Sequence, residues 1–337
     1  MPKKTLAKSF YPLILVYLRK LIGQMSTNKD AVQHEVPTLR AFIQLLVDEM
    51  ERAQRFTTAR NYRRACDSFM KYRLGAPLRL DALTAAEVQR YNDYLFKNGL
   101  RRNTVSFYNR ILRAAYNQAV LRNLVKQADP FKSVYTGVDV TRKRALSVEI
   151  LRRIITMDIP EPDLAWSRDL FLFSFQTRGM SFVDMAFLTQ SNIQAGFITY
   201  IRRKTGQVLS VQIEPWIEKL LARLKPFCTQ PYLLPILHAR DAKVAFREYQ
   251  IALGRYDRLL KRLGQAVGAP FPLSSYSARH SWATIARDTA VPLAIISSGM
   301  GHTSEKTTRI YLASLDNSLV DRANQHVWES ILAGRKD

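Results

Sequence analysis

Four residues in the second half of the sequence have side chains that could together break and rejoin a phosphodiester bond. Tyr311 could supply the oxygen nucleophile that attacks phosphorus and forms a covalent phosphotyrosine, which conserves the bond energy for religation without ATP. Arg279 could fork onto two nonbridging phosphate oxygens, and His302 could donate to the phosphate or transfer a proton. Lys204 could protonate the leaving 5′-oxygen as a general acid. Since every cation in this set is a side chain, the chemistry requires neither a metal nor a cofactor.

The segments that carry these residues follow one another at defined spacings. One expected helix carries Tyr276 and Arg279 three residues apart, which places them on one helical face. A glycine turn over residues 299–303 then holds His302. Tyr311 lies nine residues after His302, on the next expected helix. The order predicts that a turn and two helices assemble the site.

This arrangement resembles the tyrosine recombinase (phage integrase) family, whose last motifs read H-x-x-R-H and L-G-H followed by T-T and Y. The family also has a lysine in a β-hairpin, and here Lys204-Thr205-Gly206 lies about 75 residues before the arginine motif. The resemblance covers roughly residues 36–330. Residues 177–184 and 278–282 are similar to recombinases of Bacteroidetes mobile elements and DNA invertases of invertible promoters.

The resemblance implies a mainly α protein, with an N-terminal four-helix SAM-like core-binding domain. The second domain would be a mixed α/β catalytic domain, mostly helical with a small β-hairpin or sheet. It implies a site-specific DNA recombinase that clamps double-stranded DNA and cuts one strand at a time, leaving a 3′-phosphotyrosyl link. Strand exchange would pass through a Holliday junction held by a homo-tetramer, formed from protomers that are monomeric in free solution. Accessory DNA-bending proteins are further expected partners, and integration, excision and inversion stay open as outcomes.

Two positions depart from the family pattern. Tyr276 stands where the family has histidine, and tyrosine can donate a hydrogen bond to a phosphate but carries no positive charge. The first family arginine lies three residues before an acidic residue, and aligning on Asp184 puts Ser181 there. Arg178 is one helical turn upstream, so if this segment is helical it shares a face with Ser181 and can reach the same phosphate. The alternative is that Arg178 only pairs with Asp184 or with the DNA backbone.

Two other functions stay open. A type IB topoisomerase uses similar chemistry but religates the same strands, so an exchange of strands between two labelled duplexes separates it from a recombinase. The other is a DNA-binding regulator with weakened or lost catalysis, for which the altered first-arginine motif is the argument. The complete set of Tyr311, Arg279, His302 and Lys204 argues against that regulator.

The composition points to a polyanionic partner. The 337 residues include 51 Lys and Arg against 28 Asp and Glu, a net charge of +23, which favours nucleic-acid binding. A hydrophobic share of 47% supports the two domains expected at this length. Cys66 and Cys228 are too few for a disulfide-dense secreted scaffold, and the five scattered histidines have no zinc-site spacing.

The first 35 residues are expected to form an N-terminal arm or helix. Their apolar run over residues 11–18 is too short to span a bilayer, and no small-residue cleavage site follows it. We therefore expect a cytoplasmic protein without a membrane partner.

Residues 36–133 are expected to form the helical, DNA-clamping domain. The first helix repeats apolar residues from Leu39 to Met50 at helical spacing, and the second turns Tyr62, Ala65 and Phe69 inward. A capping box begins the third helix at Thr84, and Asn103 is the expected cap of the fourth. The basic residues expected to contact phosphates are Arg60, Arg63, Arg64, Arg101, Arg102 and Arg110.

Residues 134–146 are expected to be a linker against DNA, with phosphate contacts from Arg142, Lys143 and Arg144. The catalytic domain would then span residues 147–337. Two β-rich runs around Lys204-Thr205-Gly206 predict a hairpin over 197–213. Further helices are expected at 215–224, 241–267, 275–288, 291–299, 304–313 and 317–332. The last is the C-terminal exchange helix, because the family often docks such an apolar segment into a neighbouring protomer.

Overall fold

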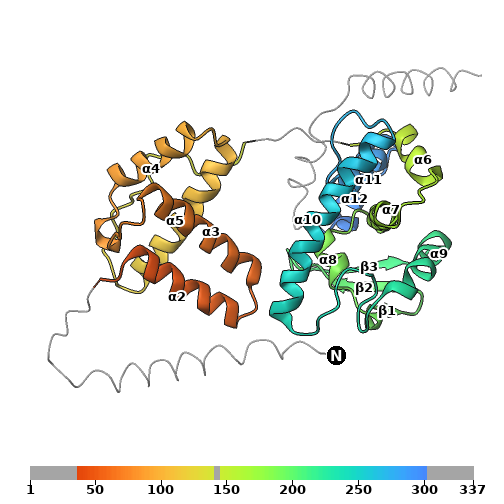
Figure 1. The fold of residues 1–337 in the computed structure, drawn as a ribbon, viewed down its shortest axis with the longest axis horizontal. Helices are drawn as coiled ribbons and strands as arrows, with labels where there is room; N and C mark the ends of the chain where they lie inside the picture. The colour runs from red at the N-terminus through yellow and green to blue at the C-terminus, as the bar shows by residue number, and fades with distance from the viewer. Residues whose placement is uncertain (1–35, 140–144, 302–337) are drawn as a thin grey trace, which may run out of the picture. The chain divides into compact units, whose positions relative to one another are not determined.

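The computed structural model describes residues 36–139 and 145–301, and the chain divides into two compact units between residues 137 and 138 (Figure 1). Each unit has a hydrophobic core of its own. Several predictions lie outside the described residues: the N-terminal arm, the last two helices, and the sites at Arg142, Lys143, Arg144, His302 and Tyr311.

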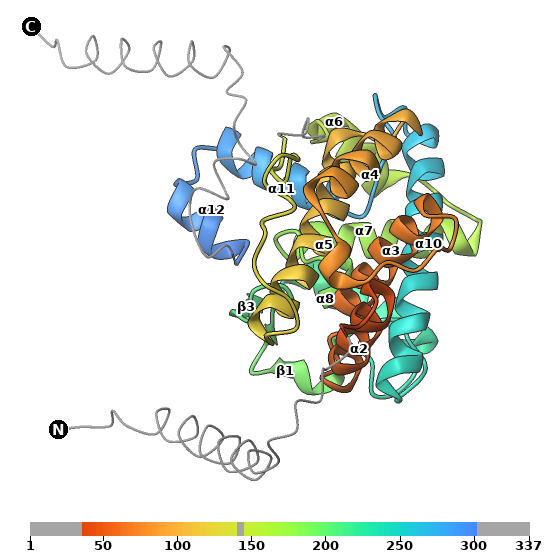
Figure 2. The ribbon, with the colours of Figure 1, turned by 90° about the vertical axis from the view of Figure 1, so that its left-hand side faces the viewer.

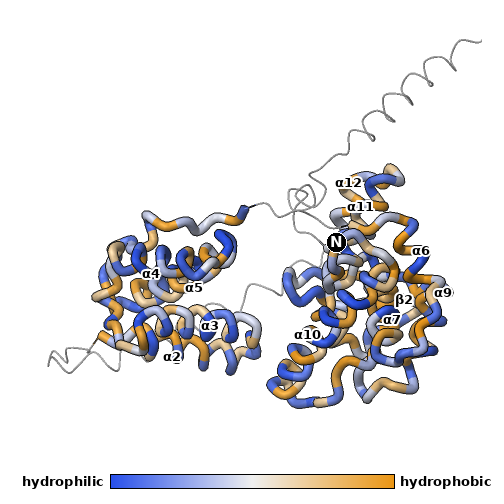
Figure 3. Tube along the Cα trace, turned by 45° about the horizontal axis from the view of Figure 1, so that its top comes forward, coloured by the Kyte–Doolittle hydropathy of each residue, from blue (hydrophilic) through white to orange (hydrophobic). Residues whose placement is uncertain are grey.

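Four helices make up the part of the first unit that the structure describes, as predicted. They are α2 (Leu39–Arg52), α3 (Phe56–Tyr72), α4 (Ala85–Lys97) and α5 (Arg102–Leu121), with a short 3₁₀ turn η1 (Leu80–Ala82) before α4. Hydrophobic and hydrophilic residues alternate along these helices, as helices with one buried face require (Figure 3). Thr84 caps α4 by accepting a hydrogen bond from the backbone N–H of Glu87. The expected cap at Asn103 is wrong, because α5 already begins at Arg102.

The predicted inward residues of the first unit form its core. Tyr62, Ala65 and Phe69 of α3 are all buried, and the ring of Phe69 packs edge-on against that of Tyr91 on α4. Val134, at the start of the expected linker, is also buried in this core. The first unit therefore continues beyond the last turn of α5.

The second unit is mostly helical and holds one small sheet. Within residues 145–301 its helices are α6 (Val148–Thr156), α7 (Pro162–Gln176), α8 (Phe182–Ala186), α9 (Pro215–Leu224), α10 (Ala242–Ala266), α11 (Ser277–Asp288) and α12 (Leu293–Gly299). The same described range also contains two 3₁₀ turns, η2 (Gln190–Asn192) and η3 (Lys225–Phe227). The helices α11 and α12 pack against each other (Figure 2).

The sheet has three antiparallel strands in the order β1 (Ile193–Gln194), β2 (Phe197–Ile201), β3 (Val208–Gln212). The predicted hairpin is the pair β2–β3, in register with Thr199 opposite Ser210. Strand β1 was not predicted, because two residues are too short for an alternating pattern. Ile198 and Tyr200 point into the core, so the odd-numbered residues of β2 lie on the other face.

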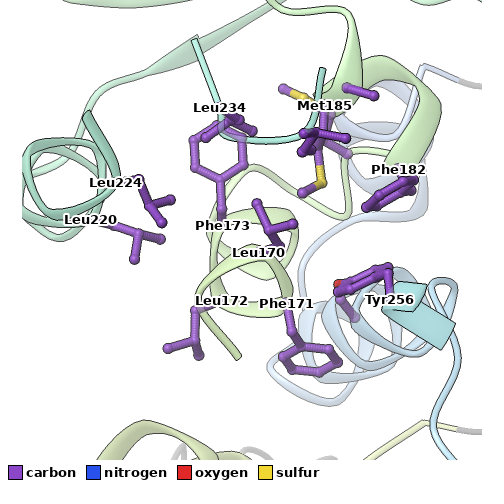
Figure 4. Close-up of a cluster of buried hydrophobic side chains, with 14 of the residues drawn as sticks. Leu170, Phe171, Leu172, Phe173, Phe182, Met185, Leu220, Leu224, Leu234 and Tyr256 are labelled. Carbon is purple, nitrogen blue, oxygen red and sulfur yellow. The ribbon is translucent and has the colours of Figure 1, made fainter. Parts of the chain in front are cut away.

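Helix α7 was not predicted either. It contributes four consecutive residues to the core, Leu170 to Phe173, all of them buried. Their side chains leave the helix in different directions (Figure 4), because α7 packs against α9, α10 and α11 at once. A helix that is buried on all sides has no apolar stripe, so the periodicity that reveals an amphipathic helix is missing.

Candidate active site

Arg279 lies in the first turn of α11 and is only 3% exposed. Its Nη1 donates to the backbone oxygen of Gly179 at 2.8 Å, and its Nη2 donates to that of Met300 at 2.6 Å. The first acceptor follows α7 and the second follows α12. Arg279 therefore joins three segments that are distant in the sequence.

Gly179 is required by this close approach. Its φ of +74° lies in the left-handed region that favours glycine. A Cβ at this position would also lie 2.6 Å from Cα of Arg279. The glycine thus allows the turn after α7 to touch the backbone of α11.

Arg178 lies in the same turn and not on a helix. Helix α7 ends at Gln176, and Arg178 has φ +60°, so positions 178 and 181 do not share a helical face. The Arg178 Nη1 donates to the backbone oxygen of Ser210 on β3 at 3.4 Å. Its Cδ packs beside Gly299, where an added Cβ would lie 3.5 Å from it. Arg178 and Arg279 are nevertheless neighbours. Both contact the end of α12, and Arg279 also binds the residue that follows Arg178.

Ser181 takes a different role from the one its alignment suggested. It is the N-cap of α8, and its hydroxyl donates to Oδ2 of Asp184 at 2.6 Å. The other carboxylate oxygen of Asp184 accepts the backbone N–H of Arg203 at 2.9 Å. Asp184 therefore holds α8 and the β2–β3 loop, and among the described residues Arg178 is not its ion-pair partner.

Lys204 is exposed in the loop of residues 202–207 that joins β2 to β3. Two hydrogen bonds close this loop at its base, from Arg202 N to the Gln207 oxygen and from Gly206 N to the Arg202 oxygen, both at 2.8 Å. Together with the bond to Asp184, they fix the backbone on both sides of Lys204. Lys204 therefore places a flexible, positively charged side chain on a loop whose backbone is fixed.

The electrostatic environment of Tyr200 shows that these groups share one region. Burial raises the pKa of the Tyr200 hydroxyl, and the nearby carboxylate of Asp184 raises it further. The guanidinium groups of Arg279, Arg202 and Arg178 act on the same pKa in the opposite direction. Three arginines and one carboxylate therefore lie within electrostatic reach of a single hydroxyl.

Arg202 was missed by the sequence reasoning. It is 5% exposed, and its guanidinium donates to the backbone oxygen of Gly301. A signal existed, since Ile198 and Tyr200 face the core and the two-residue alternation of a strand continues to position 202. The charged side chain obscured that pattern.

Tyr276 immediately precedes α11 as its N-cap, so it flanks the helix that carries Arg279. It is 42% exposed, whereas Arg279 is buried, so the two side chains differ in their access to solvent. The Tyr276 ring lies 6.1 Å from that of His280, measured between centroids.

Two of the predicted phosphate contacts in the first unit have partners within the protein. Arg63 forms an ion pair with Glu51 at 2.7 Å. Arg102 places its guanidinium 3.9 Å above the ring of Tyr135. A phosphate would therefore compete with Glu51 for Arg63 and with the Tyr135 ring for Arg102.

The remaining four positions differ in exposure. Arg64 and Arg101 are exposed, while Arg60 and Arg110 are half-buried. Arg110 donates from Nε to the backbone oxygen of Ser106 at 3.4 Å. Exposed guanidinium groups retain their full reach, so Arg64 and Arg101 are accessible to a phosphate.

Among the described residues, no group of three or more His, Cys, Asp and Glu side chains is arranged to hold a metal ion. In the same part of the chain, no helix combines the length and apolarity needed to cross a membrane.

The fold and the site define a class: a helical N-terminal unit, and a second unit in which arginines converge beside a lysine-bearing hairpin. Residues 38–135 match the family model of the phage integrase SAM-like domain, and residues 145–318 match that of the phage integrase family. The second match alone covers more than half of the chain. The protein therefore belongs to the phage integrase family and is a tyrosine-type site-specific recombinase.

A curated relative is the tyrosine recombinase XerD of Halalkalibacterium halodurans, 21% identical over 277 residues, which are 78% of this chain and 89% of that protein. The fold is similar to that of the Tn1549 transposon integrase in complex with a circular intermediate DNA, with a TM-score of 0.60 and 15% identity over 85% of this chain and 99% of the other. It is also similar to that of a lambda integrase tetramer bound to a Holliday junction, with a TM-score of 0.58 and 15% identity over 91% and 88% of the two chains.

Proposed function

We propose that this recombinase cuts and rejoins DNA strands through Tyr311, with Arg279, Arg178, Lys204, His302 and Tyr276 acting on the scissile phosphate. The observation that carries the proposal is the convergence of three groups on residues 299–301: Arg178 lies beside Gly299, Arg279 donates to Met300, and Arg202 at the base of the Lys204 loop donates to Gly301. His302 follows this turn directly, and Tyr311 follows nine residues later.

The roles follow from the charge that the reaction creates. The Tyr311 hydroxyl passes its proton to His302 as its oxygen attacks phosphorus, and the phosphorane gains negative charge, which Arg279 and Arg178 balance. The bond from phosphorus to the 5′-oxygen then breaks, and Lys204 donates the proton that this oxygen needs. His302 and Tyr276 donate hydrogen bonds to the phosphate. In the second step the 5′-hydroxyl of a partner strand gives its proton to Lys204 and attacks phosphorus, and the Tyr311 oxygen leaves and regains its proton from His302.

Double-stranded DNA is the proposed partner of both units. The basic residues Arg60, Arg63, Arg64, Arg101, Arg102 and Arg110, with Arg142, Lys143 and Arg144, would neutralise backbone phosphates and position the protein. The lambda and Tn1549 integrases of similar fold are bound to DNA, one of them as a tetramer on a Holliday junction. By analogy, we infer four protomers on two paired sites, with DNA-bending proteins as accessory partners.

A covalent trapping experiment tests the proposal. The substrates are nicked duplexes that tile the DNA flanking the gene, so that cleavage releases a short fragment and religation cannot occur. The wild-type protein should form an adduct that denaturing gel electrophoresis resolves, and Tyr311→Phe should form none. If the wild-type protein forms no adduct on any of these duplexes, the proposal is contradicted.

A second assay separates exchange from simple relaxation. Two duplexes that carry the same site and different labels are incubated together with the protein. Products that contain one strand of each label are expected from a recombinase. If the protein forms adducts but rejoins only the original strands, its activity is that of a topoisomerase.

A further inference from the structure

The residue that follows strand β2 is a buried arginine at the base of an exposed loop. Arg202 is 5% exposed, while Arg203 and Lys204, which follow it, are exposed. An arginine keeps its charge when buried, so its donors must be satisfied by the surrounding protein. Its position at the base of the loop means that whatever holds Arg202 also holds the loop that carries Lys204.

Arg202 is held by the turn that ends α12. Its Nη1 donates to the backbone oxygen of Gly301, and among the described residues no carboxylate pairs with it. Gly301 also packs tightly against the hairpin. With φ at +63°, an added Cβ on it would lie 2.8 Å from Cδ1 of Leu209 and 3.1 Å from Cδ of Arg202.

The preceding carbonyl of the same turn is held by the other buried arginine. The backbone oxygen of Met300 accepts from Nη2 of Arg279, and that of Gly301 accepts from Arg202. Two consecutive carbonyls are thus bound by two arginines, one on α11 and one on the hairpin. This is a direct mechanical link between Arg279 and the loop of Lys204.

We propose that Arg202 is a positioning residue, which ties the Lys204 loop to the Met300–Gly301 turn and so sets Lys204 relative to Arg279. The inference rests on the proposed role of Lys204 as the general acid. Because Arg202 acts through Lys204, its loss should slow the protonation of the leaving oxygen and leave DNA binding nearly unchanged.

The test is a double-mutant cycle on the full-length protein. Arg202→Met keeps the length of the side chain and removes its donors, and it should lower the rate of adduct formation on the nicked duplex by about 10²-fold. In the background of Lys204→Ala the same change should have little further effect, since a group that acts only through Lys204 has nothing left to position. DNA affinity, measured by fluorescence anisotropy on the same duplex, should change far less.

A modified substrate adds a readout that general destabilisation would not produce. Sulfur in place of the 5′-bridging oxygen makes a leaving group that needs no proton, so this substrate should restore cleavage by both Lys204→Ala and Arg202→Met. Arg279→Ala should stay slow on it, because the phosphorane charge is still uncompensated. Arg202→Lys, which keeps the charge and one donor group, should be intermediate on the normal substrate.

Arg203→Met is the matched control, because the neighbouring Arg203 side chain stacks on Phe187 and methionine can keep that contact. It should cleave within a few-fold of wild type. Should Arg202→Met fail to fold, Arg202→Gln, which retains an amide donor, takes its place in the cycle.

Three results would overturn the inference: a wild-type cleavage rate for Arg202→Met, losses that add in the double mutant, or a defect that persists on the sulfur substrate when that of Lys204→Ala disappears. If Lys204→Ala itself is not restored by sulfur, the proposed role of Lys204 fails first, and the inference fails with it.

Discussion

At the scale of single residues, the site is built from arginines that bind backbone carbonyls. Arg178 donates to Ser210 and Arg202 donates to Gly301, and neither is paired with a carboxylate among the described residues. A carbonyl satisfies a donor without neutralising its charge, so positive potential is kept for an incoming phosphate. Such a site is preorganised for an anion before DNA arrives.

A substitution of Arg178 tests whether this residue supplies the charge of the missing first arginine. Without it, the phosphorane would be balanced by Arg279, Lys204 and at most part of a charge from His302. Arg178→Ala should therefore lower the rate of adduct formation by about 10²-fold, with a much smaller change in DNA affinity. Single-turnover cleavage of the nicked duplex measures this rate. Cleavage at the wild-type rate would show that the charge comes from another group.

Ser181 provides the control for that experiment. Its hydroxyl is engaged with Asp184 at the start of α8, so Ser181→Ala should cost about 1 kcal/mol of stability through the lost cap. The double change Arg178→Ala, Ser181→Arg should not restore cleavage, because the two positions do not share a helical face. Recovery of activity in that protein would contradict the structure of this turn.

Gly179→Ala should lower both the cleavage rate and the stability, although it adds only one methyl group. The new Cβ would meet the Arg279 backbone at 2.6 Å, and alanine is strained at a φ of +74°. Since backbone cannot move aside as a flexible side chain can, we expect a cleavage loss of about 10²-fold together with a lower melting temperature. Adduct assays and thermal unfolding measure the two effects, and a fully active Gly179→Ala would mean that the α7 turn is free to shift.

At the scale of elements, a buried carboxylate joins two helices of the first unit. Glu87 on α4 is 6% exposed and forms ion pairs with Arg73, at the end of α3, and Arg90, on α4 itself. Burial by itself would raise the pKa of Glu87, but hydrogen bonds from Arg90 and Arg73 outweigh it and lower this pKa below its usual value. The charged carboxylate is therefore part of the folded structure.

The lowered pKa gives a pH-dependent contribution to stability. A carboxyl with a lower pKa in the folded state stabilises the fold above its unfolded pKa and loses that effect as pH falls through the folded pKa. Glu87→Gln should lower the free energy of unfolding by about 2 kcal/mol at pH 7. The difference from wild type should shrink in urea titrations below about pH 4. A difference that does not change with pH would mean that the charge of Glu87 contributes nothing.

At the scale of the whole molecule, the two units have separate cores and the chain carries +23. A protein that neutralises several phosphates releases counterions, so its affinity for DNA falls steeply with salt. The logarithm of the binding constant should fall with the logarithm of salt concentration by about 0.9 per phosphate contacted. A nearly flat dependence would contradict binding through the basic residues.

Two substitutions sharpen this measurement. Arg64 is exposed, so Arg64→Ala should weaken binding to all sequences alike and reduce the slope by about 0.9. Arg63 is paired with Glu51, so Glu51→Gln should free its charge and strengthen binding at low salt. Anisotropy titrations at several salt concentrations measure both. If neither variant changes the salt dependence, α3 does not contact DNA.

The local elements were predictable because their signals lie within a few residues. The apolar spacing from Leu39 to Met50, the cap at Thr84 and the hairpin over 197–213 each depend on contacts inside one segment. The same holds for the order of motifs that identified the family. Helix α7 was missed because burial on every side leaves no periodicity to detect.

The sequence by itself therefore determined the class of enzyme, the helical plan and the candidates Arg279, Lys204 and Arg178. Only the tertiary structure decided that Arg178 leaves its helix in a left-handed turn, that Ser181 caps α8, and that Arg202 is buried against Gly301. The reason is distance along the chain. Arg202 and Gly301 are 99 residues apart and Arg279 and Gly179 are 100 apart, so each contact depends on packing that no local pattern records.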